Sequence, residues 1–412
     1  MSNRRGALSG IRVLDLTRVM SGPYASAMLA DLGAEVLKIE SIGSGDLSRL
    51  FGPHVGDESA YALMLNRGKE SLTVDLKHKA GRKLILDLAA KSDVVIENFR
   101  PGVAARLGLD YDGVKAVNAE IIYASISGFG SDSPLAGHPA FDLVVQAMSG
   151  LMSVTGQPDS GATAVGESLA DVSTGMFASS GILAALVQRE RTGKGANIEV
   201  AMLDSVVSML LTPLSRLLYT DEPIRLVGNR HPETYPVDAF DTNDGQIVLV
   251  VPADPMMAGL AAAISVPSLI EDPRFVTNAM RNRHEAELRE IIANWAKTVT
   301  SEQALRMLAE QGVPCGPVRS LAEATSDEHA RIRGIVREAS HPTLGTIPVV
   351  EQPVHFGDQS HRSSQHRMPR LGADTDAVLG RVLGMTATEI SALRDAGAIG
   401  DETQMQDSQR DQ

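Results

Sequence analysis

Short apolar runs alternate with helical stretches through the first half of the chain, and this alternation restricts the fold more than any other feature. Runs typical of β-strands cover residues 11–17, 34–40, 72–76, 93–97, 121–126 and 197–201, and runs typical of helices cover residues 24–32 and 80–91. Apolar strands separated by helices are typical of βαβ units with a parallel sheet. We therefore predict an α/β fold whose ligand binds at the carboxyl ends of the strands.

The second half of the chain predicts a smaller domain. A long apolar helix is expected to continue to about residue 218, and the composition then turns polar and proline-containing over residues 221–229. A strand at residues 246–251 and helices at 284–298 and 301–311 follow, and residues 312–317 are expected to mark the exit. Residues 401–412 are polar and predict a flexible tail.

The composition excludes several classes of protein. The 38 Lys and Arg against 51 Asp and Glu give a net charge of −13, which does not suit sequence-independent nucleic-acid binding. The single cysteine, Cys315, excludes a disulfide framework and a cysteine metal cage, and a structural thiol is a simpler interpretation than a nucleophile. No stretch approaches the roughly 18 apolar residues of a membrane helix, and no signal peptide is recognisable. We expect a soluble, cytoplasmic protein.

The turn after the first predicted strand reads Thr17-Arg-Val-Met-Ser-Gly-Pro-Tyr24. It has one glycine instead of the three spaced glycines that let a backbone approach a pyrophosphate, so a nicotinamide site is not indicated. The simplest interpretation is a helix start with Ser21 as the N-cap and Pro23 near the first helical position. The same helix N-terminus is also suited to holding an anion.

The segment Asn98-Phe-Arg-Pro-Gly102 follows a buried strand at the edge where such sheets bind ligands. One interpretation is a solvated helix start. The other is a nucleotide clamp, with Phe99 as a stacking surface and Arg100 and Arg106 on phosphate oxygens.

Asp171 begins a predicted helix whose first turns are unusually small. The small residues are Ser173, Thr174, Gly175, Ala178 and Ser179. Aspartate at a helix start is most often a cap. However, glycine and serine propagate a helix poorly, which indicates that another part of the chain packs close to this backbone. A carboxylate in such a setting can act as a nucleophile.

No other sequence pattern indicates a catalytic site as clearly as the segment that begins at Asp171. His54, His78 and His138 are separated and form no metal-ligand pair at helical spacing, and no G-x-S-x-G sequence is present.

An ordered series of segments resembles the family III CoA-transferases, the group of formyl-CoA and carnitine CoA-transferases. The segments, spread over about residues 8–380, are GIRVLDLT at 10–17, SGP at 21–23, LGAEVLKIE at 32–40, NRGK at 66–69, ENFRPG at 97–102, SGFG at 127–130, FDLVVQA at 141–147, the helix of Asp171, RTGKG at 191–195, GNRHP at 228–232 and GVPCGP at 312–317.

The resemblance implies a Rossmann-like large domain with a small α+β domain inserted, in an interlocked, ring-like homodimer. The large domain would hold residues 1–220 and 326–400, the linker and small domain would hold residues 221–325, and residues 401–412 would be a tail. No permanently bound cofactor is implied, because CoA and acyl-CoA are substrates.

The resemblance also implies a mechanism and a set of CoA contacts. Asp171 would attack the donor acyl-CoA, giving first a mixed anhydride and then an aspartyl-CoA thioester that the acceptor carboxylate attacks. The implied CoA-binding residues are Met20, Ser21, Ser41, Leu72, Val74, Lys77, Asn98, Phe99, Arg100, Arg106 and Phe141.

At several positions this sequence differs from particular members of the family, and these differences reduce the number of activities to expect. The member acting on formate and oxalate has glutamine at the position of Met20 and a glycine run at residues 248–254, so formyl or oxalyl specificity is not expected. The related α-methylacyl-CoA racemases need a histidine at the position of Phe141, and phenylalanine cannot carry a proton. A catalytically silent CoA-binding protein is the other alternative.

The sequence is compatible with several substrates. We expect a small carboxylic or dicarboxylic acid as acceptor, with succinyl-CoA as a candidate donor, and intramolecular transfer is another alternative. Arg230, His231 and Tyr235 are candidates for reading a distal carboxylate, and a structural role suits each of them equally.

Overall fold

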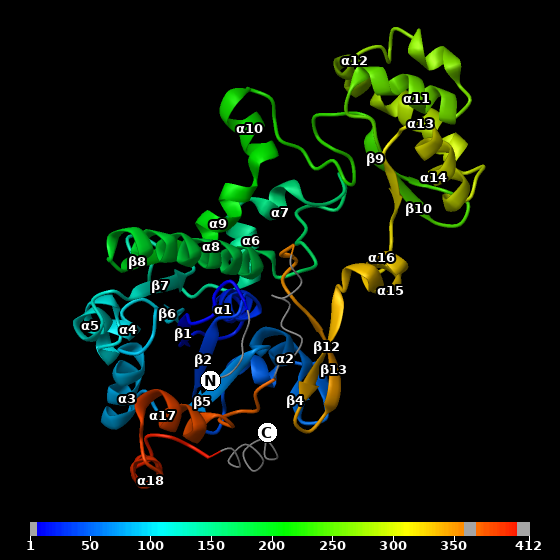
Figure 1. The fold of residues 1–412 in the computed structure, drawn as a ribbon. Helices are drawn as coiled ribbons and strands as arrows, with labels where there is room; N and C mark the ends of the chain where they lie inside the picture. The colour runs from blue at the N-terminus through cyan, green and yellow to red at the C-terminus, as the bar shows by residue number, and fades with distance from the viewer. Residues whose placement is uncertain (1–5, 358–367, 402–412) are drawn as a thin grey trace. The chain divides into compact units, whose positions relative to one another are not determined.

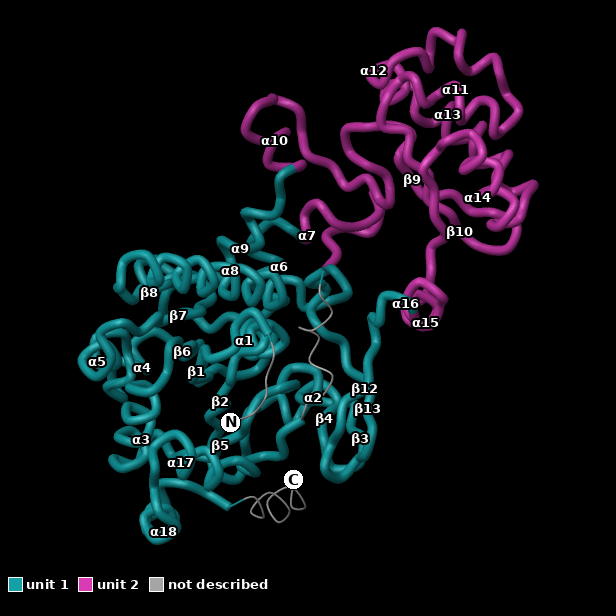
Figure 2. Tube along the Cα trace, in the orientation of Figure 1, with its two compact units in different colours: residues 1–151, 165–211, 332–412 teal, residues 152–164, 212–331 magenta. Residues whose placement is uncertain are grey.

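The computed structural model of the chain describes residues 6–357 and 368–401 and divides into two compact units (Figure 2). Unit 1 comprises residues 1–151, 165–211 and 332–412, and unit 2 comprises residues 152–164 and 212–331. These limits differ by several residues from those expected at 220 and 325. The segment 152–164 was not expected in unit 2, and its contacts with that unit include the hydrogen bond that the Gly228 N–H donates to the Gly156 carbonyl at 3.0 Å. Most of the expected tail lies outside the described residues.

Unit 1 contains a six-stranded parallel sheet (Figure 1). Its strands are β1 (Arg12–Asp15), β2 (Glu35–Glu40), β5 (Lys69–Thr73), β6 (Val94–Glu97), β7 (Ile122–Ser127) and β8 (Ala196–Ala201). They lie in the order β5-β2-β1-β6-β7-β8, and each neighbouring pair is parallel. The predicted α/β class with a parallel sheet is confirmed. The strand order reverses direction between β1 and β6, which is where doubly wound sheets open a crevice for a ligand.

Helices cover both faces of this sheet because successive strand residues point to opposite sides. Val13 and Val94 face a core shared with α1 (Ser21–Asp31) and α8 (Leu169–Thr192). Leu14 and Val95 face the other core. That second core includes α3 (Lys79–Ala89), α5 (Tyr111–Val117), α17 (Thr375–Leu383) and α18 (Ala387–Asp395).

The C-terminal helices return to the first half of the chain at strand β5. The Ser71 N–H donates to Asp374 Oδ2 at 3.0 Å, and the Thr73 N–H donates to Thr375 Oγ1 at 3.3 Å. Unit 1 is therefore built from both ends of the sequence.

Helix α8 corrects one expectation, because it is long and apolar enough by length and composition to cross a membrane. Half of its most apolar window is nevertheless buried inside the protein. The Ser179 hydroxyl donates to the Ala25 carbonyl of α1 at 3.1 Å, and Ala178 and Ile182 lie in the sheet core. These contacts are those of a core helix.

Smaller elements complete unit 1. They are η1 (Leu47–Leu50), β3 (His54–Val55), β4 (Glu58–Ser59), α2 (Ala60–Asn66), α4 (Val103–Leu107), α6 (Asp142–Met148), α9 (Met202–Met209), β12 (Val336–His341) and β13 (Gly345–Val350).

Unit 2 holds a three-stranded antiparallel sheet in the order β11-β10-β9. The strands are β9 (Val237–Asp241), β10 (Gln246–Val250) and β11 (Cys315–Pro317), and the helices packed with them include α11 (Met257–Ala263), α13 (Glu285–Ala296) and α14 (Ser301–Glu310). The predicted strand at 246–251 and both predicted helices are confirmed. Residues 315–317 form a strand of this sheet instead of the expected exit. Burial raises the pKa of the Cys315 thiol.

The long helix predicted to reach residue 218 is wrong. The segment forms α9 and a second helix, α10 (Leu211–Tyr219), separated at Leu210. Pro213 explains the break, because in a continuous helix its ring would clash with the Met209 carbonyl and its missing N–H would lose a hydrogen bond. Proline is tolerated in the first turn of the new helix.

Candidate active site

The loops after β1 and β6 meet at the point where the strand order reverses. The Arg18 N–H donates to Asn98 Oδ1 at 2.8 Å, and Asn98 Nδ2 donates back to the Arg18 carbonyl at 2.8 Å. The Arg18 guanidinium lies 5.7 Å from the centre of the Phe99 ring. This paired contact fixes two loops at the edge where parallel sheets bind their ligands.

A cavity of about 450 Å³ opens beside these loops and brings together several predicted residues. Its lining includes Arg18, Ser21, Asn98, Phe99, Arg100, Phe141 and Asp171. Phe141 is 57% exposed and presents an apolar surface to the cavity. The predicted nucleophile and five of the predicted CoA contacts therefore surround one space.

A second cavity, also of about 450 Å³, lies at the ends of β2 and β5. Its lining includes the predicted residues Ser41, Val74 and Lys77. Arg18 lines both cavities, although it was not among the residues predicted to contact CoA. A charged residue directly after the first strand is the signal that would have identified it.

Three predicted CoA contacts line neither cavity. Leu72 is fully buried in the core on the side of β5 that faces α3 and α17, because of its position in the strand alternation. Met20 is 8% exposed and Arg106 is exposed on α4, and neither borders these spaces. The structure therefore gives no side-chain support for these three contacts.

Asp171 is the third residue of α8, and its side chain is not the cap of that helix. The capping is done by Asp142 of α6, whose Oδ1 accepts the N–H of Ala170 at 2.7 Å and that of Asp171 at 3.3 Å. The interpretation of Asp171 as an N-cap is therefore wrong. Because another carboxylate satisfies these helix donors, the Asp171 carboxylate can face the cavity.

Ser21 is the residue whose polar groups favour the charged form of Asp171. Both its backbone N–H and its hydroxyl act to lower the pKa of the Asp171 carboxylate. Ser21 is the first residue of α1 and not its N-cap, which is Met20, and Pro23 is the third residue of the helix. The N–H groups of a first helical turn lack partners within the helix, and they carry the positive end of its dipole.

Gly175 allows the two helix starts to approach each other. A Cβ atom on Gly175 would lie 2.7 Å from the Ser21 carbonyl oxygen and 3.2 Å from the Ala25 nitrogen. No side chain fits there, so the small residues after Asp171 let α1 pack against the backbone of α8. The prediction of a close approach at this helix is confirmed.

The surroundings raise the pKa of Asp171 to about 6. Burial is the main cause and the negative charge of Asp142 adds to it, whereas the N–H and hydroxyl of Ser21 act in the opposite direction. A carboxylate of this kind is ionised at neutral pH but weakly solvated. Both properties favour nucleophilic attack.

A buried ion cluster supports the loop that carries Arg18 and Ser21. Lys38 Nζ lies 3.1 Å from Asp46, and Asp46 Oδ1 accepts the Val19 N–H at 2.9 Å. Lys38 also donates to the Thr17 carbonyl. Val19 has a φ of 66°, in the left-handed region that β-branched residues avoid. The surrounding hydrogen bonds hold this strained residue in place.

No group of three or more His, Cys, Asp or Glu side chains among residues 6–357 and 368–401 could hold a metal ion.

The chain is similar to known proteins along most of its length. The model of CoA-transferase family III matches residues 8–375. An acetyl-CoA:oxalate CoA-transferase of Acetobacter aceti is 42% identical over 370 residues, covering 90% of this chain and 95% of that protein. A succinyl-CoA:glutarate CoA-transferase of Mus musculus is 37% identical over 394 residues, covering 95% and 90%. The crystal structure of a CaiB/BaiF family protein from Brucella suis matches with a TM-score of 0.80 and 33% identity, covering 92% of this chain and 99% of that one.

Proposed function

This chain belongs to CoA-transferase family III, and from that premise we propose that it moves CoA from an acyl-CoA to a small carboxylic acid through covalent intermediates on Asp171. The family expected from the sequence is confirmed. The observation that carries the proposed mechanism is the position of Asp171, whose weakly solvated carboxylate lines a cavity at the reversal of the strand order.

The first half-reaction loads CoA onto the protein. An Asp171 oxygen attacks the thioester carbon of the donor, the C–S bond breaks, and a mixed anhydride and the CoA thiolate form. The thiolate then attacks Cγ of Asp171 and releases the donor acid as a carboxylate. An aspartyl-CoA thioester remains, which divides one slow exchange into easier steps.

The second half-reaction repeats these steps in reverse with the acceptor. The acceptor carboxylate attacks Cγ of Asp171, the thiolate leaves, and a second anhydride forms. The thiolate attacks the acceptor carbonyl, giving the new acyl-CoA and restoring the Asp171 carboxylate. No proton is gained or lost overall.

Ser21 is placed to stabilise the steps that occur at Cγ of Asp171. Each attack on this carbon develops negative charge on an Asp171 oxygen, and the N–H and hydroxyl of Ser21 already favour negative charge on this carboxylate. Donors fixed in position before charge develops, with the start of α1 behind them, lower the barrier of such a step.

The two cavities suggest how CoA is held. We place the thioester end in the cavity of Asp171 and Phe141, and the nucleotide end in the cavity of Ser41, Val74 and Lys77. Arg18 borders both spaces and can bind the phosphates between them.

We propose a dicarboxylate as the acceptor. The two relatives described above are named for oxalate and glutarate as acceptors, and for acetyl-CoA and succinyl-CoA as donors. The glutamine that the sequence comparison associated with oxalate is replaced by Met20, which is buried here. The substitution argues against oxalate, whereas the relative named for oxalate argues for it, so oxalate and glutarate are the two acids to compare first.

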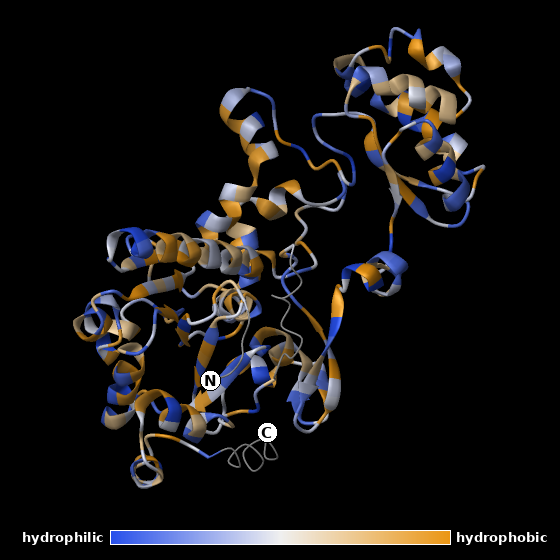
Figure 3. Cartoon of the chain, in the orientation of Figure 1, coloured by the Kyte–Doolittle hydropathy of each residue, from blue (hydrophilic) through white to orange (hydrophobic). Residues whose placement is uncertain are grey.

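We also propose the interlocked homodimer. Large apolar side chains are exposed on α6 and α8 of unit 1 and, separately, on α10 of unit 2. Figure 3 colours parts of the ribbon of α8 and of α10 orange, where these helices carry hydrophobic residues. These include Leu143 at 58%, Met176 at 49%, Leu218 at 67% and Tyr219 at 85% exposure. Apolar surface of this kind commonly marks an interface. Sedimentation equilibrium should give twice the 43.7 kDa chain mass, and a monomer at micromolar concentration would refute the proposal.

Trapping the covalent intermediate tests the mechanism. The protein is incubated with each acyl-CoA and hydroxylamine, and modified peptides are identified by mass spectrometry. A hydroxamate on Asp171, and loss of transfer in Asp171→Ala but not in Asp204→Ala on the exposed side of α9, are expected. Transfer that survives in Asp171→Ala would refute the mechanism. Acyl-CoA binding without label or turnover would instead indicate a silent CoA-binding protein.

A further inference from the structure

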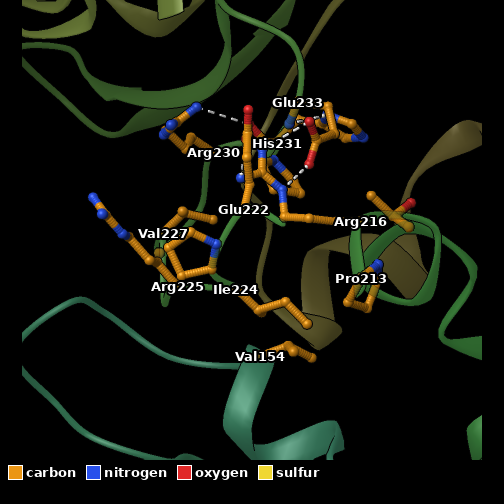
Figure 4. A pocket seen from close by; sticks show the side chains of 14 residues that line it. Val154, Pro213, Arg216, Glu222, Ile224, Arg225, Val227, Arg230, His231 and Glu233 are labelled. Carbon is orange, nitrogen blue, oxygen red and sulfur yellow. Dashed lines mark hydrogen bonds and ion pairs between the residues drawn. The ribbon is translucent and has the colours of Figure 1, made fainter. Parts of the chain in front are cut away.

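A cavity of about 580 Å³ lies entirely within unit 2 and has no part in the mechanism above (Figure 4). The first residues of α10, the loop 222–233 and Val154 form its walls. Its volume lies within the range of sites that hold small organic molecules. The same loop is anchored to residue 156 by the Gly228 hydrogen bond, so the walls belong to one compact unit.

Two of the three arginines that line this cavity already have acidic partners. Arg216 contacts Glu222 at 2.7 Å and Glu233 at 2.6 Å. Arg230 contacts Glu285 at 3.0 Å and lies over the Tyr235 ring. Arg230, a candidate from the sequence for reading a distal carboxylate, is therefore occupied by contacts within the protein.

Arg225 differs from both. It is exposed and lines the cavity, and no acidic group or hydrogen-bond acceptor pairs with its guanidinium among the residues that the structure describes. Figure 4 draws no interaction to it, in contrast to Arg216. The cavity thus offers one uncommitted planar cation.

The other residues that line the cavity indicate which class of ligand it can bind. Val154, Pro213, Ile224 and Val227 supply apolar walls beside Arg225. A guanidinium binds a carboxylate through two parallel hydrogen bonds, and the apolar walls can bury a hydrocarbon chain. Glu222 and Glu233 also line the cavity, and they disfavour a ligand with more than one negative charge.

We propose that this cavity binds an aliphatic monocarboxylate without covalent chemistry, with Arg225 on the carboxylate and the chain against the apolar walls. The site is independent of CoA transfer at Asp171. It gives unit 2 a ligand of its own, which differs from the dicarboxylate acceptor proposed above.

Calorimetric titration with butanoate, hexanoate and octanoate tests this proposal in the Asp171→Ala protein without CoA, so that no covalent transfer contributes. We expect one site per chain, with affinity rising roughly fourfold for each added CH₂ group. Arg225→Gln should weaken octanoate binding at least tenfold. Arg306→Gln, which removes the same charge from an exposed position on α14 outside the cavity, should leave it unchanged.

A variant that fills the cavity tests the shape independently of the charge. Val227→Trp should also abolish octanoate binding, and thermal unfolding of each variant verifies that unit 2 is folded. Absence of octanoate binding in the starting protein would overturn the proposal, and so would equal binding in Arg225→Gln. Competition by inorganic phosphate as strong as that by butanoate would show a general anion site instead. None of these outcomes bears on the covalent labelling of Asp171.

Discussion

Ser21, at the start of α1, favours the ionised form of Asp171 through its backbone N–H and its hydroxyl, and the first turns of α8 and α1 approach closely beside this charged group. This effect of Ser21 opposes two influences that disfavour the charge, namely burial and the nearby Asp142. The balance raises the pKa of Asp171 to about 6. Substitutions on the two sides of this balance should move the pKa in opposite directions.

Ser21→Ala should raise the pKa of Asp171 further, because it removes one donor that favours the carboxylate. An ionised Asp171 is needed for attack, so activity falls as the pH falls through the pKa. We expect the acidic limb of the kcat/KM profile to move up by about one pH unit. The maximal rate should also fall about tenfold or more, since an oxyanion donor is lost. Ser180→Ala, at an exposed position on α8, should change neither quantity.

Asp142→Asn should shift the same limb toward lower pH. The substitution removes the negative charge that raises the pKa of Asp171 but keeps an amide oxygen able to cap α8. Its new amide hydrogens would meet the Gln146 Nε2 donor, which now binds Asp142 Oδ2 at 2.7 Å, so about 1 kcal/mol of stability should be lost. An acidic limb that moves upward would show that Asp142 does not act through its charge.

Asp171→Asn should stabilise the fold near neutral pH. The folded protein raises the pKa of Asp171 from an ordinary 3.8 to about 6. Ionisation therefore costs no stability below about pH 4, an increasing amount between pH 4 and 6, and the full amount above pH 6. The variant should exceed the wild type by about 3 kcal/mol at pH 8 and by little at pH 4, as measured by denaturant unfolding at both pH values. Equal differences at the two pH values would contradict the assignment.

Arg18→Ala should raise the KM for acyl-CoA about tenfold, because a charge-assisted phosphate contact is lost. The pH dependence of kcat should stay unchanged, since Arg18 does not contact Asp171. Arg106→Ala is the matched comparison, because Arg106 was expected to bind CoA but lines neither cavity. A KM increase in Arg106→Ala as large as in Arg18→Ala would restore the contact that the sequence comparison implied.

The sequence predicts the sheet well because its strands are recognisable one at a time. The runs at Val13 and Val94 are apolar on both faces, as strands covered by helices on both sides must be. The break in the helix at Leu210 could have been predicted, because Pro213 is visible in the sequence. Local spacing could not show that residues 152–164 join unit 2, because this depends on a contact between distant parts of the chain.

The sequence predicted those features of the site that depend on neighbouring residues in the chain. The small residues after Asp171 indicated a close neighbour, and Gly175 confirms it. The identity of that neighbour, Ser21, could not be read from spacing, nor could the capping by Asp142 that frees the Asp171 carboxylate. Leu72 shows a different error, because the resemblance implied a CoA contact but the side chain faces the core.

Val19 allows a test of the strain in the loop that carries Ser21. Its φ of 66° costs a β-branched residue roughly 1–2 kcal/mol, whereas glycine adopts this conformation freely. Val19→Ala keeps the strain and Val19→Gly removes it, although both delete the side chain. Despite the greater flexibility of unfolded glycine, Val19→Gly should be the more stable of the two by about 0.5–1 kcal/mol in urea unfolding. If alanine were the more stable, the contacts of Asp46 with Val19 and Lys38 would not be holding a strained backbone.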